Sequence, residues 1–143
     1  MTAHGEQHDN VFELTTQVRF SEVDHRKVMT IPAIINMFQD CVTFQGDAVG
    51  LSHDVLKAEM RAWVLTHWHI VIDRAPRLHE QVRLGTFASR FRGMLATRNF
   101  YLRDETGELL VRANSSWGFV DLATGKLARA EARFTEPYGT HEA

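Results

Sequence analysis

The sequence contains little of what marks a secreted, membrane-spanning or nucleic-acid-binding protein. Its single cysteine, Cys41, in 143 residues excludes an internal disulfide and a cysteine-rich zinc site. With 16 Lys and Arg against 18 Asp and Glu, the formal net charge is -2, which argues against a dedicated nucleic-acid binder. No apolar run reaches the roughly 18 residues of a membrane span, and the polar N-terminus lacks the apolar core of a signal peptide. We therefore expect a cytoplasmic protein that binds neither nucleic acid nor membrane.

The remaining composition predicts one globular domain. Hydrophobic residues make up 44% of the chain and charged residues 24%, both ordinary values for a folded domain. Because both ends of the chain are polar, we expect a disordered tail over residues 1–10 and a second tail over 138–143. The folded domain is expected over residues 11–137.

One long apolar helix is predicted among segments with strand patterns. Thr30 can cap a helix, Pro32 suits its first turn, and apolar residues at helical spacing continue to Gly46 or Gly50. Strand patterns cover residues 11–20, 62–72, 82–91, 95–103 and 109–121, with a short helical turn near 53–60. A helix this apolar must be covered, so we predict an α+β fold with a curved antiparallel sheet of five or six strands around it. A helix-first cone of the NTF2-like type fits the same periodicity.

Several polar side chains are candidates for chemistry. Asp24 precedes the predicted helix start by six residues, where the positive end of the helix dipole favours an anion. Gln39 and Asp40 are polar positions on an otherwise apolar helix.

The remaining reactive residue types carry no predicted chemistry. His67 and His69 share one face of a predicted strand, but no third ligand is spaced nearby, so we expect no metal site. Cys41 lies on the apolar stripe of the helix, where a thiol is usually core filler.

Several short motifs of the sequence resemble those of a known family. The segment VRFSEVDHRKVMTIPAIINMFQDCVTFQGDAVG, residues 18–50, resembles the opening of the acyl-ACP thioesterases, in which a strand ending in E-x-D leads into a helix with an L-x-x-x-x-Q-(E/D) core. Residues 34–40 occupy that core here. The W-V-L word at 63–65, the H-x-x-I-x-R-(Y/A)-P segment at 69–76 and the G-E-L-to-Trp strand at 107–117 follow in the family's order. The resemblance covers residues 17–129.

This resemblance implies a fold, an activity and partners. The fold is the hotdog, a long helix wrapped by an antiparallel sheet, and the activity is hydrolysis of acyl thioesters in fatty acid metabolism, without a cofactor. The substrate is an acyl-ACP or an acyl-CoA. Family members commonly carry two tandem hotdogs, and this chain resembles the first. A single hotdog generally builds its sites with a second copy, which implies a homodimer or a tetramer.

The resemblance also assigns catalytic roles. The tandem enzymes carry a D-x-N-x-H word in their second half, and the matching loop here has Asp24, Arg26 and Val28 in those three slots. Single-hotdog thioesterases of the 4-hydroxybenzoyl-CoA type use one Asp from this loop, which makes Asp24 the predicted base or nucleophile. Another branch places its carboxylate on the helix, where Asp40 is the candidate and Gln39 would position water or the thioester carbonyl.

Substrate contacts are predicted around the helix and on the arginine-rich strands. Backbone N–H groups at the helix start would hold the oxyanion, and apolar side chains would line the acyl slot. Residues 74–103 hold seven arginines against one glutamate, a charge that would attract the acidic carrier protein or the CoA phosphates. The predicted substrate-binding residues are Ile31, Ala33, Met37, Phe38, Trp63, Arg90 and Arg92.

Two other functions remain compatible with the sequence. A non-catalytic hotdog that binds acyl groups or a partner is favoured by the missing Asn and His of the tandem enzymes. A hotdog hydratase would pair His with Asp on or near the helix, and no His lies between residues 26 and 52, which argues against it.

Overall fold

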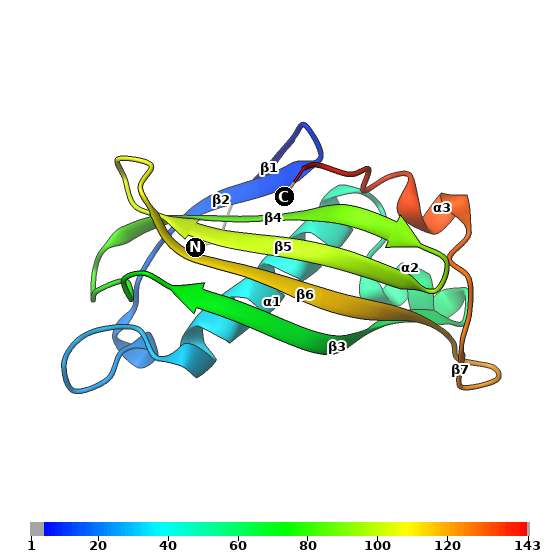
Figure 1. Cartoon of the computed structure of the whole chain (residues 1–143), viewed down its shortest axis with the longest axis horizontal. Coiled ribbons are helices and arrows are strands. Elements are labelled where there is room, and N and C mark those ends of the chain that lie inside the picture. The colour runs from blue at the N-terminus through cyan, green and yellow to red at the C-terminus, as the bar shows by residue number, and fades with distance from the viewer. Residues whose placement is uncertain (1–4, 143) are drawn as a thin grey trace.

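A seven-stranded antiparallel sheet curves around one long helix in the computed structural model, which describes residues 5–142 (Figure 1). The strand order is β1-β2-β4-β5-β6-β3, and β7 pairs with β6. The strands are β1 (Gly5–His8), β2 (Val11–Gln17), β3 (Arg61–Ile72), β4 (Gln81–Arg92), β5 (Leu95–Arg103), β6 (Leu109–Asp121) and β7 (Lys126–Leu127). The first strand after the long helix, β3, therefore forms one edge of the sheet, and the N-terminal hairpin forms the other.

The long helix α1 (Ile31–Ala48) begins where the sequence predicts. Thr30 Oγ1 accepts the Ala33 N–H at 3.2 Å, and Pro32 occupies the first turn. Its buried face packs against the concave side of the sheet, and Phe38 stacks on Phe100 of β5 with ring centroids 4.8 Å apart. The shorter helices are η1 (Phe20–Glu22), α2 (His53–Ala58) and α3 (Ala132–Thr135).

The strands and their turns follow the alternation in the sequence. Phe12 and Leu14 of β2 are buried, as are alternate residues of β5. The turns at Gly93 and Gly125 have φ of 62° and 71°, a left-handed conformation that favours glycine. In the described part of the chain, no helix is both long and apolar enough to cross a bilayer.

Both predicted tails differ from the structure within the described residues. Gly5–His8 form β1, which makes the sheet seven-stranded together with the two-residue β7, instead of five- or six-stranded. This polar segment forms a strand because each of its four residues pairs with a residue of β2. Residues 1–4 of the predicted N-terminal tail lie outside the described residues.

The predicted C-terminal tail over 138–143 also begins with an ordered segment. Tyr138 is buried beside α3, and the His141 N–H donates to the Ala88 carbonyl of β4 at 2.9 Å. Asn10 Nδ2 donates to the Thr140 carbonyl, which joins this segment to the β1–β2 turn. Ala143 lies outside the described residues.

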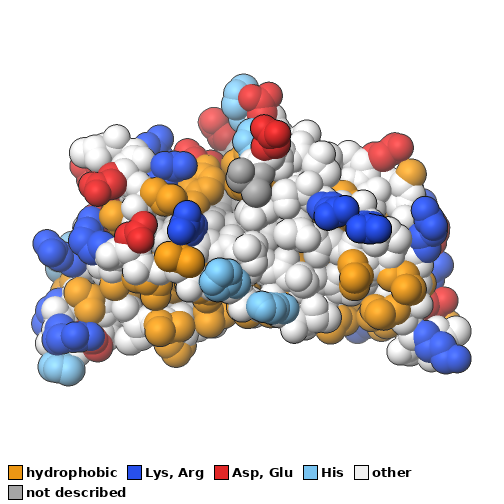
Figure 2. All heavy atoms as spheres, in the orientation of Figure 1, with side chains coloured by type: hydrophobic (Ala, Val, Ile, Leu, Met, Phe, Trp, Pro, Cys, Tyr) orange, Lys and Arg blue, Asp and Glu red, His pale blue; other side chains and the backbone are white. Residues whose placement is uncertain are grey.

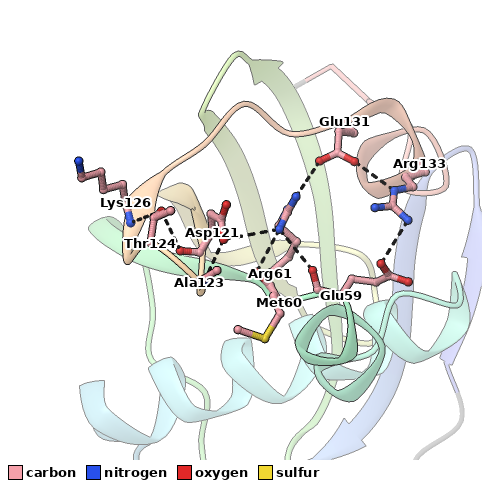
Figure 3. Close-up of polar contacts among 9 residues, drawn as sticks. All are labelled: Glu59, Met60, Arg61, Asp121, Ala123, Thr124, Lys126, Glu131 and Arg133. Carbon is pink, nitrogen blue, oxygen red and sulfur yellow. Dashed lines mark hydrogen bonds and ion pairs between the residues drawn. The ribbon is translucent and has the colours of Figure 1, made fainter.

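A network of ion pairs fixes α3 to the end of the sheet (Figure 3). Arg61, at the start of β3, reaches Glu131 at 3.3 Å and Asp121 at 3.7 Å. Arg133 of α3 pairs with the same Glu131 at 3.1 Å and with Glu59 at 3.4 Å. The segment after β7 is therefore held against the start of β3 and the C-terminal end of α2, with Phe134 buried beneath it.

Candidate active site

The loop between η1 and α1 holds Asp24 by its own backbone. Asp24 Oδ1 accepts the Arg26 N–H at 2.8 Å and the Val28 N–H at 3.4 Å. The Arg26 guanidinium donates to Asp24 Oδ2 at 3.1 Å. The loop is fixed one step earlier by Glu22, whose carbonyl accepts the Thr30 N–H at 3.0 Å. Asp24 therefore lies in a closed loop that leads directly into the Thr30 cap of α1.

The surroundings of Asp24 keep its carboxyl ionised. Desolvation alone would raise its pKa, but the hydrogen bonds from the backbone and the guanidinium of Arg26, and from the Val28 N–H, outweigh it and lower the pKa. A carboxylate with a lowered pKa is a weak base but remains a charged nucleophile or a charged partner for water at neutral pH.

The first turn of α1 offers fewer free amides than predicted. Pro32 has no N–H, and the Ala33 N–H is already donated to Thr30 Oγ1. The Ile34 N–H bonds the Thr30 carbonyl at 3.1 Å. Of the two predicted donors, Ile31 and Ala33, it is Ile31 whose N–H takes part in none of these hydrogen bonds.

Gln39 and Asp40 lie away from the Asp24 loop. Both are exposed on α1, and ten helical residues place Asp40 roughly 15 Å along the axis from Thr30. Asp40 borders an open groove with Arg19, Thr16, Met37 and Phe44. Asp24 and Asp40, the two candidate catalytic carboxylates, therefore lie in different parts of the molecule.

The predicted acyl-slot residues have different environments. Phe38 is fully buried between Phe100 and Trp68 and belongs to the core. Met37 is buried but reaches the edge of the Asp40 groove. Trp63 of β3 lines a separate small cavity between the C-terminal half of α1 and the sheet.

Arg90 and Arg92 lie at the C-terminal end of β4, just before the turn into β5. This end of the sheet is the one beside α3 (Figure 1). Both side chains are exposed. In the view of Figure 2, the lower middle of the face carries mainly uncharged groups and histidine, while acidic side chains gather at its upper edge and basic ones lie to either side.

Sequence reasoning missed the most unusual residue of the Trp63 cavity. Arg98 of β5 lines the cavity and is only 8% exposed. Its Nη1 donates a hydrogen bond to Gln45 Oε1 of α1 and another, at 3.1 Å, to Thr86 Oγ1. The signal was present in the strand pattern, because Arg98 alternates in phase with the buried Ala96, Phe100 and Leu102. An arginine in an inward phase indicates a buried charge.

Neither Cys41 nor the histidine pair adds to the site. Burial raises the pKa of the Cys41 thiol to about 12, which leaves it protonated and unreactive. His67 and His69 are exposed on β3. Among residues 5–142, no three His, Cys, Asp or Glu side chains are grouped so that they could hold a metal ion.

Comparisons with known proteins agree with this architecture. The model of the family described as acyl-ACP thioesterase N-terminal domain matches residues 9–138. The palmitoyl-acyl carrier protein thioesterase of Arabidopsis thaliana chloroplasts is 26% identical over 127 residues, which cover 83% of this chain and 31% of that protein. The chain thus spans about a third of the length of the curated relatives it matches.

Solved structures show the same fold. The 12:0-ACP thioesterase of Umbellularia californica superposes with a TM-score of 0.85 at 22% identity, covering 96% of this chain and 56% of that one. The 1,4-dihydroxy-2-naphthoyl-CoA thioesterase of Synechocystis superposes with a TM-score of 0.80 at 15% identity, covering 90% and 95%. The hotdog prediction is confirmed, and the NTF2-like alternative is set aside.

Proposed function

The chain belongs to the family of acyl-ACP thioesterase N-terminal domains, and from this premise we propose that it hydrolyses acyl thioesters in fatty acid metabolism. The observation that carries the proposal is the Asp24 carboxylate, held ionised beside the start of the long hotdog helix. The resemblance to single-hotdog thioesterases of the 4-hydroxybenzoyl-CoA type implies an Asp at this position.

Asp24 is proposed to act on the thioester carbonyl. As a nucleophile it would attack the carbonyl carbon and expel the thiolate, which takes a proton from water. A second water would then hydrolyse the acyl-aspartyl anhydride to the free acid and restore the Asp24 carboxylate. As a base it would take a proton from the attacking water, and its low pKa favours the first role. The Ile31 amide at the dipole-positive helix start would stabilise the oxyanion.

A second arrangement of the same reaction uses the exposed helix face. Asp40 would activate water, and Gln39, one residue earlier, would position the water or the carbonyl. The groove beside Asp40 includes Met37 and Phe44, which offer apolar surface to an acyl chain.

The carrier is proposed to be ACP or CoA. Arg90 and Arg92 are exposed at one end of β4, where they would attract an acidic carrier protein or the phosphates of CoA. The free thiol of Cys41 fits a reducing compartment, which supports the proposed cytoplasmic location.

The edge strand β3 supports assembly with a second hotdog. It is twelve residues long and pairs with β6 on one side only. Arg61, at its start, is the only Lys or Arg in β3, and Val64 is 47% exposed. Long edges without protective charges favour pairing with another strand. We propose that a second copy pairs here as a homodimer, and that the weakly charged lower middle of the face seen in Figure 2 allows stacking into a tetramer.

A non-catalytic role remains the second candidate function. The Arg26 guanidinium pairs with Asp24 Oδ2, and neither Arg26 nor Val28 supplies the Asn or His of the tandem enzymes. A hotdog whose carboxylate is occupied by an ion pair would bind acyl groups or a partner without turnover.

A thiol-release assay tests the proposal. The purified protein is given acyl-CoA and acyl-ACP thioesters from short to long chain, beside Asp24→Asn and Asp40→Asn. Asparagine retains the Oδ1 acceptor for the loop amides, so the fold is preserved while the charge is lost. We expect Asp24→Asn to lose about a hundredfold or more in turnover.

Asp104→Asn is the matched control, because Asp104 also accepts loop N–H groups, from Thr106 and Glu108, but lies in the β5–β6 turn. Unchanged turnover in Asp24→Asn with loss in Asp40→Asn would transfer the role to the helix carboxylate. Acyl-ACP binding without thiol release by the wild-type protein would establish the non-catalytic candidate.

A further inference from the structure

The cavity around Arg98 holds a buried positive charge without a carboxylate partner. No Asp or Glu of residues 5–142 lies within 4.0 Å of the Arg98 guanidinium, since the ion pairs of the described chain involve other arginines. Its partners are the neutral Gln45 and Thr86, and the Tyr138 ring, whose centroid lies 5.2 Å from Arg98 Cζ. Arginine stays protonated in proteins, and a buried charge is costly unless an opposite charge pairs with it.

The walls of the cavity are apolar on the sides that Arg98 does not occupy. Val42 of α1 and the rings of Trp63, Phe91 and Trp117 line it. Tyr138 closes the end beside α3 and is itself 4% exposed. The space measures about 360 Å³, counting the volume at its mouth. That figure includes open solvent, and the part that the centres of water-sized spheres can occupy is about 40 Å³, so the cavity admits only a small ligand whose outer end lies at the mouth.

We propose that this cavity binds a short apolar carboxylate, whose carboxylate pairs with Arg98 and whose hydrocarbon body packs against the tryptophans. A carboxylate supplies the missing negative charge with bidentate geometry that suits a guanidinium. The aromatic walls give the hydrocarbon a site from which water is excluded. The site is distinct from the Asp24 loop, because Gln45 lies roughly 22 Å along α1 from Thr30.

Two sources of this ligand chemistry exist. The carboxylate belongs either to a free short-chain acid or to the far end of an acyl group that carries a second acid function. The first makes the cavity a sensor or retention site for an acid, and the second makes Arg98 a determinant of acyl specificity. The proposal does not depend on hydrolysis, because binding is measured without turnover.

Calorimetric titration with hexanoate tests the charge directly. Hexanoate is compared with hexanamide, which has the same shape but no charge, on the wild-type protein and on Arg98→Gln. We expect hexanoate to bind the wild-type protein and hexanamide to bind about ten- to a hundredfold more weakly. Arg98→Gln should lose the difference between the two, whereas Arg112→Gln, at an exposed arginine of β6, should keep it.

A second variant tests the cavity without removing the buried charge. Val42→Phe fills the space beside Trp63 and leaves the Arg98 contacts in place, so it should abolish hexanoate binding even if Arg98→Gln does not fold. Asp24→Asn should bind hexanoate normally, which separates this proposal from the catalytic one.

The two sources are separated with thioesters. If the carboxylate is the end of an acyl group, adipoyl-CoA binds about tenfold or more tightly than hexanoyl-CoA in the wild-type protein, and this preference is lost in Arg98→Gln. If it is a free acid, hexanoate binds while the two thioesters do not differ. The proposal is overturned if hexanoate and hexanamide bind alike, or not at all, and the two thioesters also bind alike.

Discussion

Replacing the Arg98–Gln45 pair by apolar residues should stabilise the ligand-free protein. Burying a guanidinium costs several kcal/mol, and neutral acceptors return less of this than a carboxylate would. Replacement of buried charged groups by apolar residues of similar size is often neutral or stabilising by about 1–4 kcal/mol. We expect Arg98→Met combined with Gln45→Leu to raise the free energy of unfolding within this range.

The double variant leaves neither Thr86 nor the former partners of Gln45 buried without a hydrogen bond. Thr86 Oγ1 still donates to the Asn99 carbonyl at 3.0 Å. Gln45 Nε2 bonds Gln7 Oε1 and the Asn10 carbonyl, both on exposed residues that water can reach. The single variant Arg98→Met differs, because it leaves Gln45 Oε1 buried without its arginine donor, at a cost of about 1–3 kcal/mol.

Urea denaturation followed by circular dichroism measures these differences, with all variants at one protein concentration because assembly would shift the apparent stability. The double variant should be more stable than both the wild-type protein and the single variant. A double variant less stable than the wild-type protein by more than about 1 kcal/mol would refute the reasoning, and it would mean that Arg98 is a structural residue of the core.

Three further predictions follow from the site, the edge strand and the core. Because the pKa of Asp24 lies below its ordinary 3.8, the carboxylate stays ionised as pH falls, and its contribution to kcat/KM is lost only below pH 3.8. A pH–rate profile in which kcat/KM already falls with acid above pH 5 contradicts this assignment. Val64→Lys should shift sedimentation velocity toward monomers by placing charge on the β3 edge, and an unchanged distribution argues for another interface. Phe38→Ala should lower the free energy of unfolding by about 3–5 kcal/mol in urea denaturation, since Phe38 is fully buried against Phe100; a loss below about 1 kcal/mol would contradict this packing.

Most of the fold was predictable because burial acts on each segment separately. Phe12 and Leu14 alternate with polar residues and are buried on one face of β2. Thr30 and Pro32 mark the helix start by hydrogen-bonding rules that operate within four residues. Such local signals need no knowledge of distant segments.

The rest depends on partners that are distant in the sequence. The segment Gly5–His8 has no apolar stripe and becomes a strand through its pairing with β2. Tyr138 lies in a polar stretch and is buried because the Arg61 network brings α3 over the cavity.

The candidate site shows the same division. The position of Asp24 before the helix was predictable, but its pairing with Arg26 was not, because it depends on how the loop closes. The charge of Arg98 was counted with the surface arginines, although its strand phase pointed inward.

The placement of Tyr138 has a consequence for protein synthesis. Residues 132–141 leave the ribosome after strands β1 to β7, yet they close the cavity and bond Asn10 and Ala88. A nascent chain that ends before them exposes the aromatic walls and the Arg98 guanidinium to water, and its N-terminal hairpin lacks the contacts that Thr140 and His141 make. Contacts about 130 residues apart also form slowly, because a long loop must close first. Translation of residues 132–141 is therefore the step at which the interior of this sheet becomes sealed.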